Sequence, residues 1–439
     1  MRFILEQSDE SLTTHSGLSL IGLLTNKVQL RSRLNEAIFA EFKNPEISHA
    51  DVVVSYLGLL AQGKSDFEHI EPFRQDQFFA MALGCQHVPS APTLRQRLDA
   101  APHQEWETIL REEAVAVLQK ANVKLTPTQH ELVPLDADVS PFDNSDSHKE
   151  GVAMTYAKVS GYAPIFFYLG QEGYLIDLEL RQGSVHSQNG TASLLKRAIT
   201  SARQLTEARL LVRLDAGNDS LENIQTCVDV PGVDYLIKRN LRQETKEQWL
   251  QTAQAHGHLE EPRPGKKVWT GSVMVAREGI AHQLRIVFEV IERTINKTGQ
   301  ALLVPEIEVA TYWTSRADDP KTTITLYHEH GTMEQFHSEI KSELDLERLP
   351  SGKFATNSLV LHIGMLAYNL LRLIGQESLN AATQPLRKKV KRRRLRTVIQ
   401  NLITLATRVV RHARQWKLAF GHYSPWYPVF RHVYLAFSP

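Results

Sequence analysis

Cysteine is scarce in this sequence of 439 residues. Cys85 and Cys227 are the only two cysteines, and they lie far apart and outside any CxxC spacing. This pattern argues against a disulfide framework and against a thiolate zinc site. It is compatible with a reducing compartment, so we expect a cytoplasmic protein.

Long apolar runs and nucleotide-binding glycine patterns are also missing. The first residues, MRFILEQSDESL, lack the apolar stretch and the cleavage site of a signal peptide. The longest uncharged run, from Phe354 to Leu371, contains two asparagines, a serine and a histidine. We therefore expect a buried amphipathic helix there and no membrane partner. Without a P-loop or a Rossmann glycine pattern, a nucleotide cofactor is not expected.

Acidic residues are absent from one end of the chain. No Asp or Glu follows Glu377, whereas 13 Lys and Arg do, and the formal net charge of the whole chain is only +1. A basic tail on an acidic body predicts a polyanionic partner, with nucleic acid first, although a basic segment can also be a solvated face. The candidate DNA-binding residues here are Arg387, Lys388, Lys391, Arg392, Arg393 and Arg394.

The hydrophobic pattern changes character along the chain. Apolar residues recur at helical spacing up to about residue 125, and then a series of three strands, helix, strand, helix and strand follows. That order predicts an α/β core in which helices cover a mixed sheet. We divide the chain into a helical N-terminal region with a possible DNA-end-binding role (1–128), a first core part (129–238), a β-rich insertion outside the core sheet (239–318), a second core part (319–378) and a basic helical C-terminal region (379–439).

Three acidic positions lie where an active site would need them. In LVPLDADVS, Asp136 and Asp138 share one face of a predicted strand, and Asp215 follows a later apolar strand. Glu334 lies near the start of a predicted helix, with Lys341 seven residues on and on the same face. Carboxylates brought together repel unless cations lie between them, and Mg²⁺ prefers oxygen ligands. Taken alone the pattern is weak, since a strand-end Asp is more often a turn or cap residue.

A spacing motif adds to this pattern. Tyr327, His330, Glu334 and Lys341 match the spacing of the Tyr, Arg, Glu and Lys signature of DDE transposases from bacterial insertion sequences. LDADVS resembles the first-aspartate strand of these proteins, and RLDAGND resembles the second-aspartate segment. The chain resembles the 1380 family of insertion sequences from about residue 15 to 420. It departs from the pattern at His330, which replaces an arginine, and at Asn218-Asp219, which replace an aromatic residue.

The resemblance implies an RNase H-like core and a DNA transposase. It implies that Asp138, Asp215 and Glu334 are catalytic and hold two Mg²⁺ ions, for which Mn²⁺ can substitute. Tyr327, His330 and Lys341 would then contact DNA phosphates. The implied reaction is cleavage at terminal inverted repeats of double-stranded DNA and transfer of the 3′-hydroxyl into target DNA by a homodimer.

Several alternatives stay open. The chain could be a transposase-derived DNA-binding protein without catalysis, or an RNase H-like nuclease without strand transfer. Strand geometry cannot choose between Asp136 and Asp138, and only the resemblance favours Asp138. Another set, His328, His330 and His337, would suit zinc but lacks the HExxH spacing. The tryptophans of the insertion, Trp269 and Trp313, suit either base stacking or the core.

Overall fold

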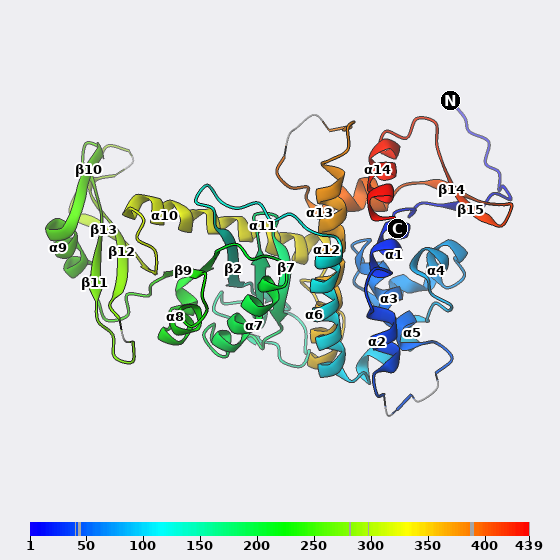
Figure 1. Ribbon diagram of the computed structural model, residues 1–439, viewed down its shortest axis with the longest axis horizontal. Helices are drawn as coiled ribbons and strands as arrows, with labels where there is room; N and C mark the ends of the chain where they lie inside the picture. Colours follow the sequence, from blue (N-terminus) through cyan, green and yellow to red (C-terminus); the bar gives the residue numbers. More distant parts are fainter. Residues whose placement is uncertain (40, 43–44, 281, 297, 387–389, 439) are drawn as a thin grey trace.

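The structure is a computed structural model that describes all residues except 40, 43–44, 281, 297, 387–389 and 439. Its parts follow one another along a long axis (Figure 1): N-terminal helices at one end, a mixed sheet in the middle, and the strands of the insertion at the other end. Arg387 and Lys388, which we expected to bind DNA, lie outside the described residues.

The N-terminal region is helical, as predicted. Ser48, Asp76 and Ser90 cap three of its helices by accepting hydrogen bonds from backbone N–H groups of the first turn. Arg97 of the α5 segment (Ala91–Asp99) is buried and donates to the Ile47 carbonyl oxygen. The elements are β1 (Leu12–Thr13), α1 (Leu18–Thr25), α2 (Leu30–Glu36), α3 (His49–Leu60), the 3-10 helix η1 (Phe67–Phe73), α4 (Gln77–Leu83), α5 (Ala91–Asp99) and α6 (His103–Lys120).

The core sheet has the mixed arrangement predicted from the order of strands and helices. Its strands lie in the order β7-β6-β2-β8-β9, antiparallel from β7 to β2 and parallel from β2 to β9. This is the α/β topology of an RNase H-like core. The elements are β2 (Val133–Val139), β6 (Ile165–Leu169), β7 (Tyr174–Glu179), α7 (Thr191–Arg203), β8 (Leu210–Leu214), the 3-10 turn η2 (Ala216–Asn218), α8 (Leu221–Val228) and β9 (Val233–Lys238). A small sheet, in the order β3-β5-β4, follows β2 and comprises β3 (Phe142–Asp143), β4 (Ala153–Met154) and β5 (Ser160–Tyr162).

The two faces of β2 differ, as the alternation of its residues predicted. Leu135, Ala137 and Val139 enter the main hydrophobic core, which also contains apolar residues of α7 and α8. Asp136 lies on the other face, where it meets Arg213 of β8. Because strand residues alternate, Asp138 shares that face.

The insertion is β-rich, as predicted, but the expectation that it lies outside the core sheet was wrong. Its strands continue the sheet beyond β9, since residues 312–314 of β13 pair antiparallel with residues 236–238 of β9. β13 is long enough to pair with β12 along most of its length and with β9 at its end. The elements are α9 (Lys246–His256), β10 (Gly257–Arg263), β11 (Lys266–Val275), β12 (Leu284–Ile295) and β13 (Ala301–Thr314).

Helices return after the insertion, as predicted. They are α10 (Pro320–His328), the 3-10 turn η3 (Glu329–Thr332), α11 (Met333–Ser338), the π-helical turn η4 (Glu339–Glu343) and α12 (Phe354–Ser378). Among the described residues α12 alone is long and apolar enough to cross a membrane, and almost all of its most apolar stretch is buried inside the protein. It packs against α6, α3 and β7, so it joins the N-terminal helices to the core.

The C-terminal region, 379–439, is only partly helical, so the expectation of a helical region was wrong in part. After α13 (Leu395–Val398) and the π-helical turn η5 (Ile399–Ile403), the chain forms a hairpin of β14 (Thr407–His412) and β15 (Gln415–Phe420) before α14 (Tyr427–Phe437). Alternation of exposed and buried residues in β14 accounts for this, since Val409 is buried between Arg408 and Val410. β1 adds a third strand beside β14.

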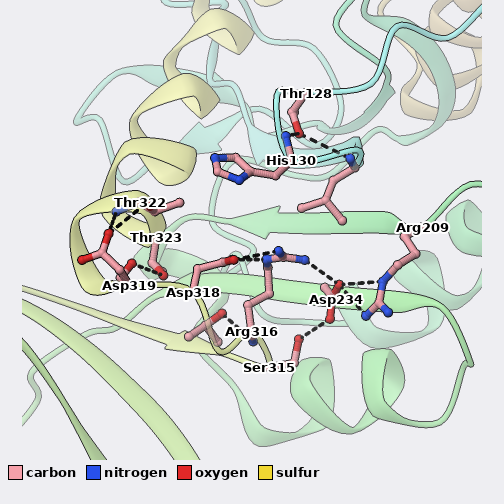
Figure 2. Close-up of polar contacts among 12 residues, drawn as sticks. Thr128, His130, Arg209, Asp234, Ser315, Arg316, Asp318, Asp319, Thr322 and Thr323 are labelled. Carbon is pink, nitrogen blue, oxygen red and sulfur yellow. Dashed lines mark hydrogen bonds and ion pairs between the residues drawn. The ribbon is translucent and has the colours of Figure 1, made fainter.

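A polar network fixes the return of the insertion to the core (Figure 2). Arg316, just after β13, lies between Asp318 and Asp234, and its Nη1 is 3.1 Å from Asp234 Oδ2. Arg209, just before β8, also donates to Asp234 at 2.9 Å, and the Ser315 hydroxyl donates to it at 3.0 Å. The buried Asp234 carboxylate therefore ties β8, β9 and the start of α10 together at one end of the sheet.

We predict that Asp234→Ala lowers the free energy of unfolding by about 2–3 kcal/mol, because Arg209, Ser315 and Arg316 lose their shared buried acceptor while Arg316 keeps Asp318. Asp319→Ala is the matched control, since Asp319 is exposed and only caps α10. It should cost about 1 kcal/mol. Urea unfolding of both variants measures the difference, and equal losses would contradict the role given to Asp234.

Candidate active site

Asp138 and Asp215 come from neighbouring parallel strands. The register of β2 and β8 places Asp136 opposite Arg213 and Ala137 opposite Leu214. Asp138 and Asp215 are the next residues in that register, at the carboxyl ends of strands roughly 4.8 Å apart. The sheet therefore brings two acidic side chains to one edge, as the sequence predicted.

The Asp136 carboxylate is paired with Arg213 and His330 inside the protein. Its two oxygens accept hydrogen bonds from Arg213 Nε and Nη2 at 2.6 and 2.7 Å, and His330 Nδ1 lies 3.1 Å from Oδ1. Burial acts to raise the pKa of this carboxyl, but Arg213 and His330 hold it below its ordinary value. Asp136 is thus a buried structural ion pair, and this agrees with Asp138 as the candidate catalytic residue.

Asp215 has the opposite electrostatic environment. Burial first and the neighbouring Asp138 second raise the pKa of its carboxyl. Asn218 Nδ2 donates to Asp215 Oδ1 at 2.7 Å, and the Gly217 N–H also donates to the carboxylate. These neutral donors orient the side chain but supply no positive charge, so the Asp138–Asp215 pair is short of cations.

Asp138 lies beside two side chains that the sequence analysis did not assign to it. His337 Nε2 is 3.5 Å from Asp138 Oδ2, and the other ring nitrogen of His337 lies 3.3 Å from the hydroxyl of buried Tyr168. Tyr156, from the loop between β4 and β5, donates to the Val139 carbonyl oxygen at 2.9 Å. Burial, then Asp138 and Asp215, raise the pKa of Tyr156 to about 12.

Glu334, the third predicted acidic residue, is exposed in the first turn of α11. It lies three residues before His337, which is the helical spacing for side chains on one face. The π-helical turn that follows α11 is fixed to α12 by a fully buried ion pair between Glu339 and Arg372. Arg372 also donates a hydrogen bond to the Tyr368 hydroxyl. Among the described residues no group of three His, Cys, Asp or Glu side chains is arranged to hold a metal ion. Glu334 as a ligand therefore stays a prediction.

The other residues of the spacing motif differ in accessibility. Tyr327 is half-buried, and burial followed by Asp215 raises its pKa, so it lies near the carboxylate pair. Lys341 Nζ donates to the Pro141 carbonyl oxygen at 2.5 Å, just past the end of β2. His330 is buried against Asp136, and the expectation that it contacts a phosphate is not supported.

The basic stretch before α13 is only partly available to a partner. Arg393 is buried and bonded to Ser378, so it was wrongly predicted to contact DNA. Arg392 lies over the Phe336 ring at 4.3 Å and donates to the Gln171 carbonyl oxygen, which leaves it little exposed. Arg394 pairs with Glu343 at 2.5 Å but keeps 44% of its side chain exposed. Lys391 is exposed and stays a predicted contact.

The insertion tryptophans and the histidines have structural partners. Trp269 and Trp313 are both buried, and Trp313 Nε1 donates to Asp219 at 2.9 Å, which favours the core interpretation. The departure Asn218-Asp219 is explained in the same way, because Asn218 orients Asp215 and Asp219 binds Trp313. Helical spacing from Glu334 was the signal that would have indicated His337 beside the site.

Comparisons with known proteins give the family of the chain. The family model described as "Transposase DDE domain group 1" matches residues 4–438. No curated protein matches the chain. A piggyBac transposase synaptic complex with hairpin DNA, solved by cryo-EM, is similar with a TM-score of 0.42 and 10% sequence identity, over 90% of this chain and 83% of that chain.

We predict that substitutions at Asp136 and Asp138 have unequal effects on the free energy of unfolding. Asp136→Ala should lower the free energy of unfolding by about 3–5 kcal/mol, because it strands the buried Arg213. Asp138→Ala should change it by no more than about 0.5 kcal/mol, since Asp138 is partly exposed and repels Asp215. Chemical denaturation tests both, and a reversed order would mean that Asp136 is the free carboxylate.

The pH dependence of stability should report the same repulsion. The folded-state pKa of Asp215 is raised above its ordinary value of 3.8. The contribution of this group to the free energy of unfolding is therefore largest below pH 3.8, and it decreases as the pH rises through the folded-state pKa. Asp138→Asn should make this fall smaller, since it removes one of the two causes of the shift. Denaturation from pH 3 to pH 7 measures the wild type and the variant, and parallel curves would contradict the coupling.

Proposed function

Because the chain belongs to the transposase family with a DDE domain of group 1, we propose that it cleaves the ends of a DNA element and joins them to target DNA. The carboxylate pair of Asp138 and Asp215 supports this proposal most directly. Two acidic side chains at the ends of parallel strands suit chemistry at a phosphodiester. Asp138 is partly exposed, and among the described residues neither carboxylate is paired with a Lys or an Arg, although His337 lies 3.5 Å from Asp138.

The same residues fit a divalent metal ion. The donors are oxygen atoms, which Mg²⁺ and Mn²⁺ prefer, and the neighbouring groups Asn218 and Tyr156 are neutral. Asp138 and Asp215 would hold the ions, with Glu334 from α11 as a further ligand. When bound, the metal supplies a Lewis acid for the attacking and leaving oxygens of the phosphodiester.

The chain's own side chains would position the DNA around this pair. Lys341 contacts the chain just after the carboxyl end of β2, and Tyr327 lies near Asp215. Both are therefore proposed to contact phosphates that flank the reacting bond. Lysine suits this role as a point charge. Tyr156 covers the carbonyl oxygen that follows Asp138, and its exposed ring faces solvent beside the pair.

The alternatives remain a DNA-binding protein without catalysis and a nuclease without strand transfer. The uncompensated pair argues against the first, because a binding protein gains nothing from two carboxylates that repel each other. Strand transfer in place of simple cleavage is proposed on family membership alone.

We predict that Asp215→Ala and Glu334→Ala each abolish DNA cleavage, by at least about a hundredfold, and leave DNA-end binding within about threefold. Metal ligands act on the transition state, whereas binding rests on dispersed phosphate contacts. Cleavage assays and gel-shift titrations with the DNA that flanks the element's gene provide the two measurements.

The matched control is Glu329→Ala, which removes an exposed carboxylate five residues before Glu334 and should leave cleavage unchanged. Wild-type cleavage by Glu334→Ala would remove Glu334 from the proposed site. Wild-type cleavage by Asp215→Ala would remove the carboxylate pair.

A further inference from the structure

The β14–β15 hairpin projects from the end of the molecule that carries the N-terminal helices, away from the core sheet (Figure 1). Its two strands of six residues pair from Thr407 opposite Phe420 to His412 opposite Gln415. The base is anchored, since Val409 is buried and β1 pairs with the outer side of β14. Towards the turn both strands are exposed on both faces.

Positive charge surrounds the exposed half of this hairpin. Lys417 lies on one face, Arg411 lies on the other, and Arg414 occupies the turn between them. All three are exposed, and among the residues that the structure describes none of them forms an ion pair. Arg408 lies nearer the base and pairs with Glu10 at 2.7 Å, so part of its charge is already compensated.

Arg414 lies in the turn between β14 and β15, where the backbone conformation is unfavourable for a residue with a side chain. Ala413 and Arg414 have φ angles of 48° and 63°, in a two-residue loop that strongly favours Asn and Gly. Residues with a Cβ are disfavoured in this left-handed region. Nothing in the packing requires an arginine there, because residues 411–417 are all exposed.

We propose that this hairpin is a β-ribbon that enters a groove of double-stranded DNA, an inference that rests on the proposed function and assigns it a second DNA contact. A two-stranded ribbon has the width that the major groove admits. A ribbon in a groove has phosphates along both sides, and the charges on both faces and at the tip of the hairpin complement them. The hairpin is a cationic surface separate from the stretch before α13, where Arg392 and Arg393 are occupied inside the protein.

The test is the salt dependence of binding to duplex DNA by the full chain. The triple variant Arg411→Ala, Arg414→Ala and Lys417→Ala should flatten the slope of log affinity against log salt by roughly 2.5–3 units, at about 0.9 per phosphate contact. Replacing both arginines by lysine should retain most of the slope. Thermal unfolding of each variant should match the wild type, because the altered side chains are exposed.

A matched control separates local contacts from bulk charge. Lys120, Lys124 and Lys196 are exposed and lie outside the hairpin, and their replacement by alanine removes the same charge. An unchanged slope in the hairpin variant, or equal flattening in both triple variants, would overturn the proposal. So would equal flattening with a single strand of the same length and sequence.

Cleavage distinguishes this proposal from the proposed function. At low salt and saturating DNA the hairpin variant should cleave within about threefold of the wild type, because its carboxylate pair is intact. If the wild type fails to cleave but the hairpin variant shows the flattened slope, the catalytic proposal fails and the ribbon stands.

Discussion

The parallel pairing of β2 with β8 determines the position of the carboxylate pair on which the proposed function depends. Its register sets Asp136 beside Arg213, and it brings Asp138 and Asp215 to the same edge one residue further on. A slip of one residue would turn every side chain of β2 to the other face of the sheet. The buried ion pair of Asp136 with Arg213 opposes such a slip, because a shifted register would leave both charges unpaired inside the protein.

Positive charge is distributed unevenly around this register. Asp136 and Glu339, the carboxylates behind the site, each have a buried arginine, and these pairs hold β2 and α11 in place. Asp138 and Asp215, the carboxylates in front, have neutral or weakly placed partners. The cation that we propose from solution would complete the charge balance of the site, because the buried arginines of the protein pair with the carboxylates behind it.

The sequence predicted the regular parts of this arrangement and missed those that depend on distant contacts. The alternation of Leu135, Ala137 and Val139 with two aspartates identified the strand and its faces because a period of two is a local signal. It could not distinguish Asp136 from Asp138, since the difference lies in Arg213, 77 residues away. His330 was predicted to contact a phosphate because its true partner, Asp136, is 194 residues away in the sequence and no local pattern indicates it.

The hairpin shows a different limit of local patterns. Its residues Arg408, Arg411 and Arg414 recur at a spacing of three, which is typical of a helix, and its turn contains neither Gly nor Asn. β14 also pairs with β1 near the other end of the chain, a contact that no local pattern indicates.

Crystals grown or soaked with Mn²⁺ provide the most direct test of the central claim. Anomalous diffraction should give a peak between the carboxylates of Asp138 and Asp215, and a peak elsewhere with none at this pair would contradict the account.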